Sequence, residues 1–462
     1  MFDCDPEGTR LPIKLDPTSN GEFCPIPLDA TSRLANRLAH AAATADAKRT
    51  GLKRRAFLVS ACGAASTLLA MNTANAAAAR IGGFYAVSDD AAFDPQLAAA
   101  ELEGDELIFD VQGHFVGKHG LGRVGLGGEA DFVKDVFMDS DTDMMVLSFI
   151  PSGRDPELLS IAEADGARRI VESLDGSRRL LLHGRVNPNQ PGDLESMDEL
   201  AERWGVVAWK CYTQWGPDGT GFYLSDEETG IRLIEKARAL GVNNVVVHKG
   251  IPFGKQSYEH SLCVDVGIVA KRFPDVNFLV YHSGFIPGRA EGPYQEGASE
   301  GVDGLITSVI ENDLGTSSNV YAELGSTWRY VMRDPDSAAH TVGKLLKYVG
   351  ENNVLWGTDS IWYGSPQDQI QAFRAFQISP ELRERHGYPE LTPALRAKVF
   401  GINALEPYGL SLDDVRASAN SDALARQRTD YLEHPNPHFC TFGPRTRREF
   451  LELQRASGGR PA

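Results

Sequence analysis

Between residues 106 and 360 the chain repeats one pattern: a short apolar run followed by a longer segment with helical spacing. This alternation favours a parallel sheet whose strands are joined by crossover helices, two of them expected at 193–203 and 225–240. The predicted strands are 107–115, 144–150, 179–187, 206–213, 244–249, 277–283, 319–325 and 354–360. Eight strands spaced by about 25 to 40 residues over about 255 residues match one α/β domain, a (β/α)8 TIM-type barrel.

A doubly wound open sheet is the rival fold. It is disfavoured because the glycines at 117–122 have the wrong spacing for a dinucleotide fingerprint and open no helix. A Walker-type Gly-Lys-Ser/Thr is also missing there. We expect a loop after the first strand, in which His119 could belong to a segment that closes over the site.

The chain of 462 residues carries a formal charge of -17 and has a pI near 5.1. Nucleic acids and anionic membranes need a basic face, so the expected partner is a small molecule. The six cysteines are too few for a disulfide scaffold. Beyond residue 76 only Cys211, Cys263 and Cys440 remain, and nothing requires them to pair.

The amino-terminal region resembles a twin-arginine export signal. Lys53-Arg54-Arg55-Ala56-Phe57-Leu58 precedes a modestly apolar run at 59–71 and then Ala74-Asn75-Ala76, an A-x-A type cleavage site. The alternative is a basic turn that leads into an ordinary amphipathic helix. The resemblance implies a periplasmic or other extracytoplasmic location, with no stable membrane association once the signal is removed. Residues 1–50 are assigned no fold.

We therefore divide the chain into a leader and signal (1–76), a lead-in (77–105), the barrel (106–410) and a carboxyl-terminal extension (411–462). The extension either caps the barrel, mediates homo-oligomerisation or is partly disordered.

Polar residues stand where the predicted strands end, and in such barrels the chemistry lies at those ends. Period-two alternation points Gln112 and His114 to the same side of the first strand. Later strands end in Lys210, His248, His282, Glu323 and Asp359. Each histidine alone is more often a satisfied core residue. Together, imidazoles and a carboxylate from different strands suit a divalent metal, with Zn or Mn preferred.

This set resembles the amidohydrolase superfamily, and more closely its branch of metal-dependent hydrolases and non-oxidative aromatic decarboxylases. The resemblance spans roughly 106–408 and rests mainly on 110–114, 245–250, 281–284 and 355–360. It implies that His114, His248 and Asp359 bind a metal. It also implies that Asp359 moves a proton and that His282 polarises substrate or binds a second, less favoured metal.

Two residues are ambiguous against that family pattern. Gln112 stands where a ligand histidine is usual, so it predicts weaker binding, a harder metal or no ligation there. Lys210 could bind a substrate carboxylate, could be carboxylated to bridge two metals, or could reach solvent at the barrel mouth. We favour substrate binding and a single metal.

Other candidates for substrate contact lie beside the predicted mouth. Arg185, on one face with His183 and Asn187, is either a carboxylate clamp or part of a rim salt bridge. Glu323 is either an orienting residue or a structural ion pair. Aromatic residues there would stack on a planar substrate or pack in the core. They are Tyr212, Trp215, Trp328, Trp362 and Tyr363.

Three functions remain after these observations. The first is hydrolysis of a small molecule, aromatic or not, by a metal-activated water, with Asp359 as proton acceptor and His282 facing the developing oxyanion. The second is non-oxidative decarboxylation of an aromatic acid at the same site. The third is an exported barrel that binds a ligand without catalysis.

Overall fold

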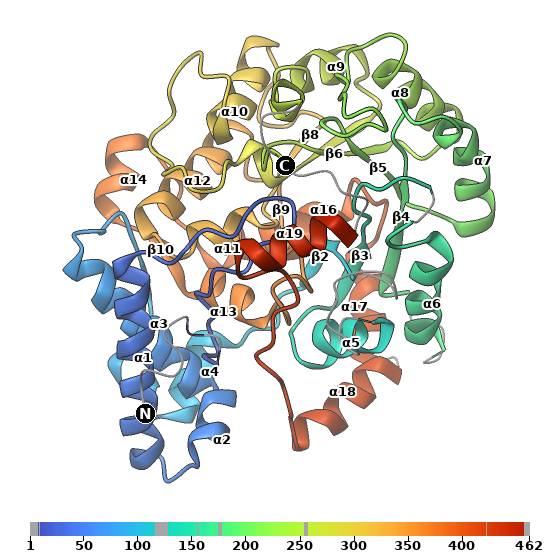
Figure 1. Cartoon of the computed structure of the whole chain (residues 1–462). Coiled ribbons are helices and arrows are strands. Elements are labelled where there is room, and N and C mark those ends of the chain that lie inside the picture. The colour runs from blue at the N-terminus through green and yellow to red at the C-terminus, as the bar shows by residue number, and fades with distance from the viewer. Residues whose placement is uncertain are drawn as a thin grey trace.

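Eight parallel strands form a nearly closed barrel in the computed structural model, in the sheet order β2-β3-β4-β5-β6-β7-β8-β9 (Figure 1). Hydrogen bonds from Val111 N to Trp356 O (3.0 Å) and from Asp359 N to Gln112 O (2.9 Å) join the first strand to the segment after the last. The structure describes residues 8, 10–115, 128–154, 157–173, 178–253, 257–421 and 423–456, so His119 and the glycines at 117–122 lie outside it. The strands are β2 (Phe109–Gly113), β3 (Met144–Leu147), β4 (Leu180–Arg185), β5 (Ala208–Tyr212), β6 (Asn244–His248), β7 (Asn277–Tyr281), β8 (Val320–Glu323) and β9 (Val354–Leu355).

The predicted barrel is therefore confirmed, and each of its eight strands lies inside its predicted range. The strands are shorter than predicted because residues at one or both predicted ends lie outside the ladder, and His282 and Asp359, for example, follow β7 and β9. After β9 only an isolated bridge between Gly113 and Ser360 continues the sheet.

An irregularity in β2 controls which side chains face inward. Phe109 and Val111 belong to the buried cluster that fills the barrel with Val246 and Leu279. The register between β2 and β3 then shifts between Asp110 and Gly113, so β2 contains one extra residue there. Such a bulge reverses which side chains of the strand point inward. Gln112 consequently faces the barrel mouth as well.

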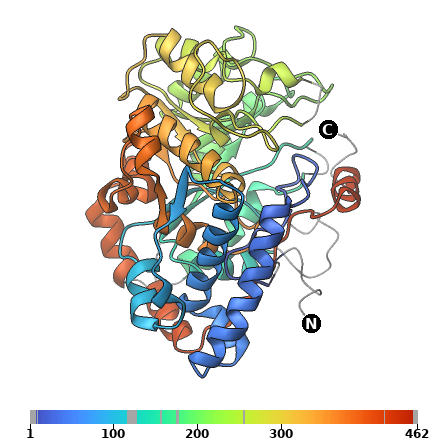
Figure 2. The same ribbon diagram turned by 90° about the vertical axis from the view of Figure 1, so that its left-hand side faces the viewer.

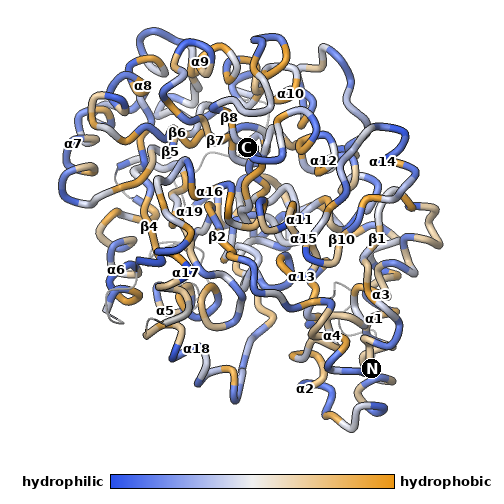
Figure 3. Tube along the Cα trace, turned by 180° about the vertical axis from the view of Figure 1, so that it is seen from behind, coloured by the Kyte–Doolittle hydropathy of each residue, from blue (hydrophilic) through white to orange (hydrophobic). Residues whose placement is uncertain are grey.

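Helices surround the barrel, and hydrophilic and hydrophobic segments alternate along them (Figure 3). The α8 helix buries Ile231, Leu233 and Ile234, as expected for an amphipathic crossover helix. The predicted helix at 193–203 is confirmed, whereas the one predicted at 225–240 begins later, at Gly230. The helices after successive strands are α5 (Glu129–Val133), α6 (Ile161–Glu172), α7 (Asp193–Trp204), α8 (Gly230–Ala239), α9 (Val266–Arg272), α10 (Gly301–Glu311), α11 (Thr327–Val331), α12 (Pro335–Tyr348) and α13 (Gln367–Ala375).

The amino-terminal region is folded, which differs from the absence of fold assigned to residues 1–50. The α1 helix (Ala30–Arg49) buries Ala35, Ala39 and Ala43 at four-residue spacing, and these small side chains let it pack closely against α3 (Ala61–Ala77). The remaining elements here are α2 (Arg54–Val59), α4 (Pro95–Leu102) and β1 (Gly83–Tyr85), which pairs with β10 (Phe376–Ile378). Together they form a helical layer on one side of the barrel (Figure 2).

The residues of the predicted export signal belong to this layer. Arg54 Nη1 donates to His40 O (3.0 Å), and Arg55 Nη2 donates to Asn436 Oδ1 (3.0 Å). Ala74, in the predicted cleavage site, is fully buried in α3. Export and cleavage both remain predictions. Within the described ranges, no helix combines the length and apolar content needed to span a membrane.

Residues 10–28, which we call the strap, run mostly buried from this layer to the barrel mouth. Figure 1 shows the dark-blue strap beside α19 in the middle of the picture. Two buried ion pairs fix it to the barrel: Lys14 Nζ lies 3.2 Å from Asp368 Oδ2, and Arg329 pairs with Asp16. Tyr330 also donates its hydroxyl to Thr18 O (3.0 Å).

The carboxyl-terminal extension contacts the strap from outside. Ser19 N donates to Pro444 O (2.9 Å), and Gln454 Nε2 donates to Gly21 O (2.8 Å). The five described cysteines form no disulfide. The elements that follow β10 are α14 (Pro380–His386), α15 (Pro393–Ala397), α16 (Asn403–Leu405), α17 (Leu412–Ser421), α18 (Ala423–Glu433) and α19 (Arg447–Ala456).

Candidate active site

The polar residues predicted from strand ends converge at one end of the barrel, where each is essentially buried. Their convergence follows from the parallel strands, whose carboxyl ends share one rim. They are Gln112 and His114 from β2, Lys210 and Tyr212 from β5, His248 from β6, His282 after β7, Glu323 from β8 and Asp359 after β9.

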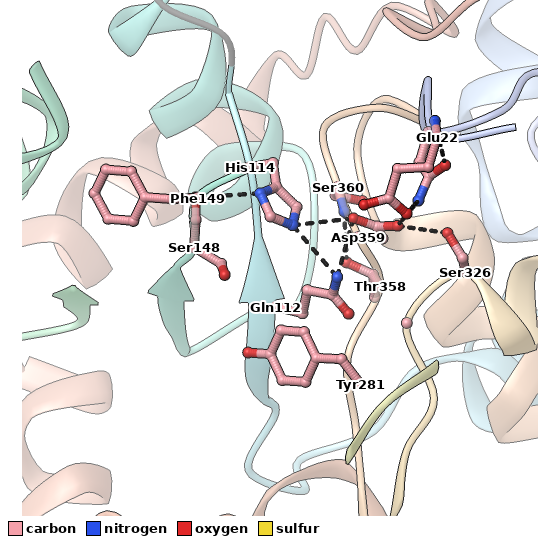
Figure 4. A network of polar contacts seen from close by, with 12 residues as sticks. Glu22, Gln112, His114, Ser148, Phe149, Tyr281, Ser326, Thr358, Asp359 and Ser360 are labelled. Carbon is pink, nitrogen blue, oxygen red and sulfur yellow. Dashed lines mark hydrogen bonds and ion pairs between the residues drawn. The ribbon is translucent and has the colours of Figure 1, made fainter. Parts of the chain in front are cut away.

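Asp359 contacts His114 in this site, with 3.1 Å between His114 Nε2 and Asp359 Oδ1 (Figure 4). Asp359 also accepts hydrogen bonds from Gln112 Nε2 (3.2 Å) and Ser326 Oγ. Burial alone would raise the pKa of Asp359, but the His114 contact and the Ser326 hydroxyl lower it to about 2. The carboxylate is therefore ionised at neutral pH.

Each imidazole is oriented by a backbone carbonyl. His114 Nδ1 lies 3.1 Å from Ser148 O, His282 Nδ1 lies 2.7 Å from Gly325 O, and His248 Nε2 lies 3.3 Å from Ile251 O. A carbonyl accepts only, so the ring nitrogen beside it carries the proton. Burial lowers the pKa of His248 well below its usual value and that of His282 to about 4. Both rings are therefore neutral, and His248 Nδ1 and His282 Nε2 are the nitrogens that carry a free lone pair.

The backbone of the site is strained. His282, Ser283, Ser326 and Asp359 have positive φ angles of 64°, 52°, 54° and 59°. Such angles are unfavourable for residues other than glycine and persist where surrounding contacts impose them. One such contact is Glu323, which accepts from His282 N at 3.0 Å and from Gly325 N. This supports the interpretation of Glu323 as an orienting residue.

Lys210 is fully buried, so the alternative of a lysine that reaches solvent is wrong. Its Nζ lies over the rings of Tyr281 (3.8 Å to the centroid) and Tyr212 (4.5 Å). Within the described residues it has no hydrogen-bond partner. Burial lowers the pKa of the Lys210 ammonium to about 8, although the Glu22 carboxylate opposes this.

Two residues of the strap complete the site, and sequence reasoning missed both. Asn20 Nδ2 donates to Asp359 Oδ2 (2.8 Å) and to Glu22 Oε2. The Glu22 carboxylate lies 3.5 Å from His248 Nδ1 and 3.9 Å from His282 Nε2. Burial and the charge of Asp359 raise the pKa of Glu22 well above its usual value. No sequence signal near residue 20 indicates this role, because its partners come from distant strands.

Several other candidates have structural partners. Arg185 bonds Glu157 Oε1 (2.7 Å) and Ser152 O (2.9 Å), which matches the rim salt bridge. Trp328 is fully buried against Phe373 and donates to Gln369 O, so it packs in the core.

The remaining aromatic residues differ in their distance from the site. Tyr212 stacks on His248 with 4.7 Å between ring centroids, and Tyr363 hydroxyl lies 2.6 Å from Ser326 Oγ. The Trp362 ring lies against Gly21 of the strap, and Trp215 is half-buried in the turn after β5. Substrate stacking by any of them stays a prediction.

The donor set fits a divalent metal. Buried polar atoms without a hydrogen-bond partner among the described residues include His248 Nδ1, His282 Nε2 and Gln112 Oε1. Glu22, His248 and His282 each offer a ligand atom, and these atoms lie within 4.8 Å of one another. Neutral imidazoles and a carboxylate are ligands typical of Zn and Mn.

A family model described as Amidohydrolase matches residues 161–410, which is more than half of the chain. The chain belongs to the amidohydrolase family. It is accordingly an enzyme, of hydrolase or lyase type. No protein of curated function matches the sequence.

Three solved structures illustrate what this amidohydrolase is similar to. An uncharacterised TIM-barrel protein of Bordetella bronchiseptica is 12% identical with a TM-score of 0.43, covering 68% of this chain and 99% of its own. A zinc-bound amidohydrolase of Burkholderia multivorans is 16% identical with a TM-score of 0.41, and the match covers 66% of this chain and 100% of that one. A 5-carboxyvanillate decarboxylase of Novosphingobium aromaticivorans, complexed with manganese, is 14% identical (TM-score 0.41; 67% and 97%).

Proposed function

We propose that the protein is a metal-dependent hydrolase of a small molecule that carries a carboxylate. The observation that supports this most is the pair of neutral, buried imidazoles, His248 and His282, whose lone pairs face the barrel mouth and meet no hydrogen-bond donor among the described residues. Leaving such atoms unsatisfied costs about 1 to 3 kcal/mol each, which a bound cation would offset. The metal we propose is a single Zn or Mn ion.

When bound, a divalent cation acts as a Lewis acid that lowers the pKa of water from about 15.7 toward 7. Asp359, ionised and held by Ser326 and Asn20, is placed to accept the proton of that water. The His282 tautomer, with its proton on Nδ1 toward Gly325 O, suits a ligand better than an oxyanion donor. Lys210 remains as the cation for a substrate carboxylate.

Decarboxylation of an aromatic acid is the second candidate, and the buried Lys210 ammonium favours it as well, because it suits a carboxylate substrate. Here the ionised Asp359 would first take a proton from water or from the substrate hydroxyl, and would then pass it to the ring carbon whose bond to carbon dioxide breaks. The purified protein, loaded with Zn or Mn, should be assayed against lactones, amides and esters with carboxylates, and against hydroxy- and amino-benzoates. Hydrolysis of the first group supports our proposal, and carbon dioxide release from the second overturns it. Failure with both would favour a ligand-binding barrel.

We also propose export by the twin-arginine route to an extracytoplasmic location. The ordered succession of Arg54-Arg55, Phe57-Leu58, the apolar run and the A-x-A site supports it. Substitution of both arginines by lysine should trap the protein in the cytoplasm. Unchanged export of a folded double variant would overturn the proposal.

A further inference from the structure

The carboxylate of Glu22 occupies an unexpected position for a residue so early in the chain. It lies in the barrel mouth facing both His248 and His282, and its side chain is only 9% exposed. The Lys210 ammonium partly balances its charge, but Glu22 makes no hydrogen bond with Lys210 Nζ among the described residues. Its position therefore needs an explanation beyond a salt bridge.

The atoms that face each other here all carry lone pairs. His248 Nδ1 and His282 Nε2 are unprotonated, because the other nitrogen of each ring faces a carbonyl oxygen. A proton on Glu22 would not satisfy them, since contacts of 3.5 and 3.9 Å are too long for an O–H···N hydrogen bond. Three lone-pair groups around one point suit a cation.

Gln112, which stands where the family usually has a ligand histidine, does not offer a nitrogen ligand to the metal in this arrangement. The Gln112 amide nitrogen faces Asp359 Oδ1 (3.2 Å) and His114 Nε2 (3.3 Å), and an amide nitrogen has no lone pair to offer a metal. The Gln112 oxygen lies on the side of Gly325. His114 and Asp359 are already paired with each other.

We propose that Glu22, His248 and His282 form the primary site for a divalent transition metal, with the strap supplying the carboxylate ligand. This inference rests on the metal dependence of the proposed function. Two histidines and one glutamate are a ligand set known from catalytic zinc sites, which keep a position for water or substrate. Asp359 then lies beside the site as the proton acceptor, linked to Glu22 through Asn20.

Contacts of the strap residues that precede Glu22 hold it in place. Asp16 is paired with the buried Arg329, and Gly21 accepts a hydrogen bond from Gln454 on α19. Gly21 has φ +81°, and a Cβ there would lie 2.5 Å from the Leu453 side chain, so a larger residue would be strained at this position. A ligand on a segment fixed in this way is preorganised for the metal. The proposal therefore also requires that the strap stays attached, which cleavage after Ala76 would prevent.

The test is a titration of the full-length, chelator-treated protein with Co²⁺. Calorimetry measures the dissociation constant, and visible absorption reports the coordination of the bound ion. Glu22→Gln should raise the dissociation constant for Co²⁺ by about tenfold or more and should change the absorption spectrum of the bound ion. The exposed Glu311→Gln, which removes the same charge elsewhere, should leave both unchanged. Glu22→His, which restores a ligand atom, should bind more tightly than Glu22→Gln.

The outcomes separate the two proposals. If the wild type binds no Co²⁺, the metal-dependent function itself fails. If it binds and Glu22→Gln binds equally well or more tightly, Glu22 is not a ligand and merely occludes the mouth. Far-ultraviolet circular dichroism of the metal-free variants establishes that they fold. Intact mass of the purified native protein shows whether Glu22 is retained, and its loss overturns this proposal alone.

Discussion

Asn20 Nδ2 donates to Asp359 Oδ2 over 2.8 Å, and thereby joins two residues 339 positions apart. Through this contact the strap becomes part of the amidohydrolase site. The same amide nitrogen reaches Glu22, so one side chain links the proposed proton acceptor to the proposed metal ligand. A region that sequence analysis assigned to a leader therefore contributes to the site.

Removal of the Ser326 hydroxyl should shift the pH dependence of catalysis. Ser326 Oγ donates to Asp359, and a donor to a carboxylate lowers its pKa. Ser326→Ala should therefore raise the pKa of Asp359 and move the acid limb of kcat/KM upward by about one pH unit. A pH–rate profile measures this, and an acid limb that stays in place or moves down would contradict the assigned role of Asp359.

Binding of a carboxylate substrate should weaken at alkaline pH. Burial lowers the pKa of Lys210 to about 8, so the ammonium loses its charge as the pH rises through that value. KM should rise by roughly tenfold per pH unit above it, since one proton is lost. Lys210→Met should have a high KM without this dependence. An equal alkaline rise in the variant would exclude Lys210 as its origin.

Arg185 should contribute to stability and not to substrate binding. Its guanidinium is bonded to Glu157 and Ser152 O, and its side chain is 8% exposed. Arg185→Gln should lower the free energy of unfolding by roughly 1 to 3 kcal/mol, with KM unchanged. Urea denaturation and steady-state kinetics check this together. The carboxylate-clamp interpretation would be correct instead if KM rose tenfold at unchanged stability.

Gln112→His should strengthen metal binding. The present amide donates to Asp359 and His114, whereas an imidazole would add a lone pair beside His114. We expect an affinity for Zn or Mn tighter by about tenfold. Competition with a chelating dye measures it. Unchanged affinity and activity would place position 112 outside the coordination sphere.

The barrel could be predicted because its signals are local. Val245 to Val247, and seven similar runs, identify buried strands, and their number and spacing fix the architecture. The same pattern predicted which polar residues lie at the carboxyl ends of the strands. The shift in β2 could not be foreseen, although Gln112 and His114 were correctly placed on one side.

Contacts between distant segments escaped the sequence. Glu22 and Asn20 depend on the path of the strap, and that path depends on Asp16 meeting Arg329, 313 residues away. Trp328 was assigned equally to the mouth and the core, because its neighbour Phe373 comes from a later helix. Long-range packing of this kind leaves no periodic signal.

Metal analysis of the purified protein tests the central claim most directly. His248 offers a buried lone pair on Nδ1 in every ligand set considered above, and its ring stacks on Tyr212. The wild type should contain about one divalent transition metal per chain, and folded His248→Ala should lose it. A wild type without stoichiometric metal, or a folded His248→Ala that keeps it, would contradict this account.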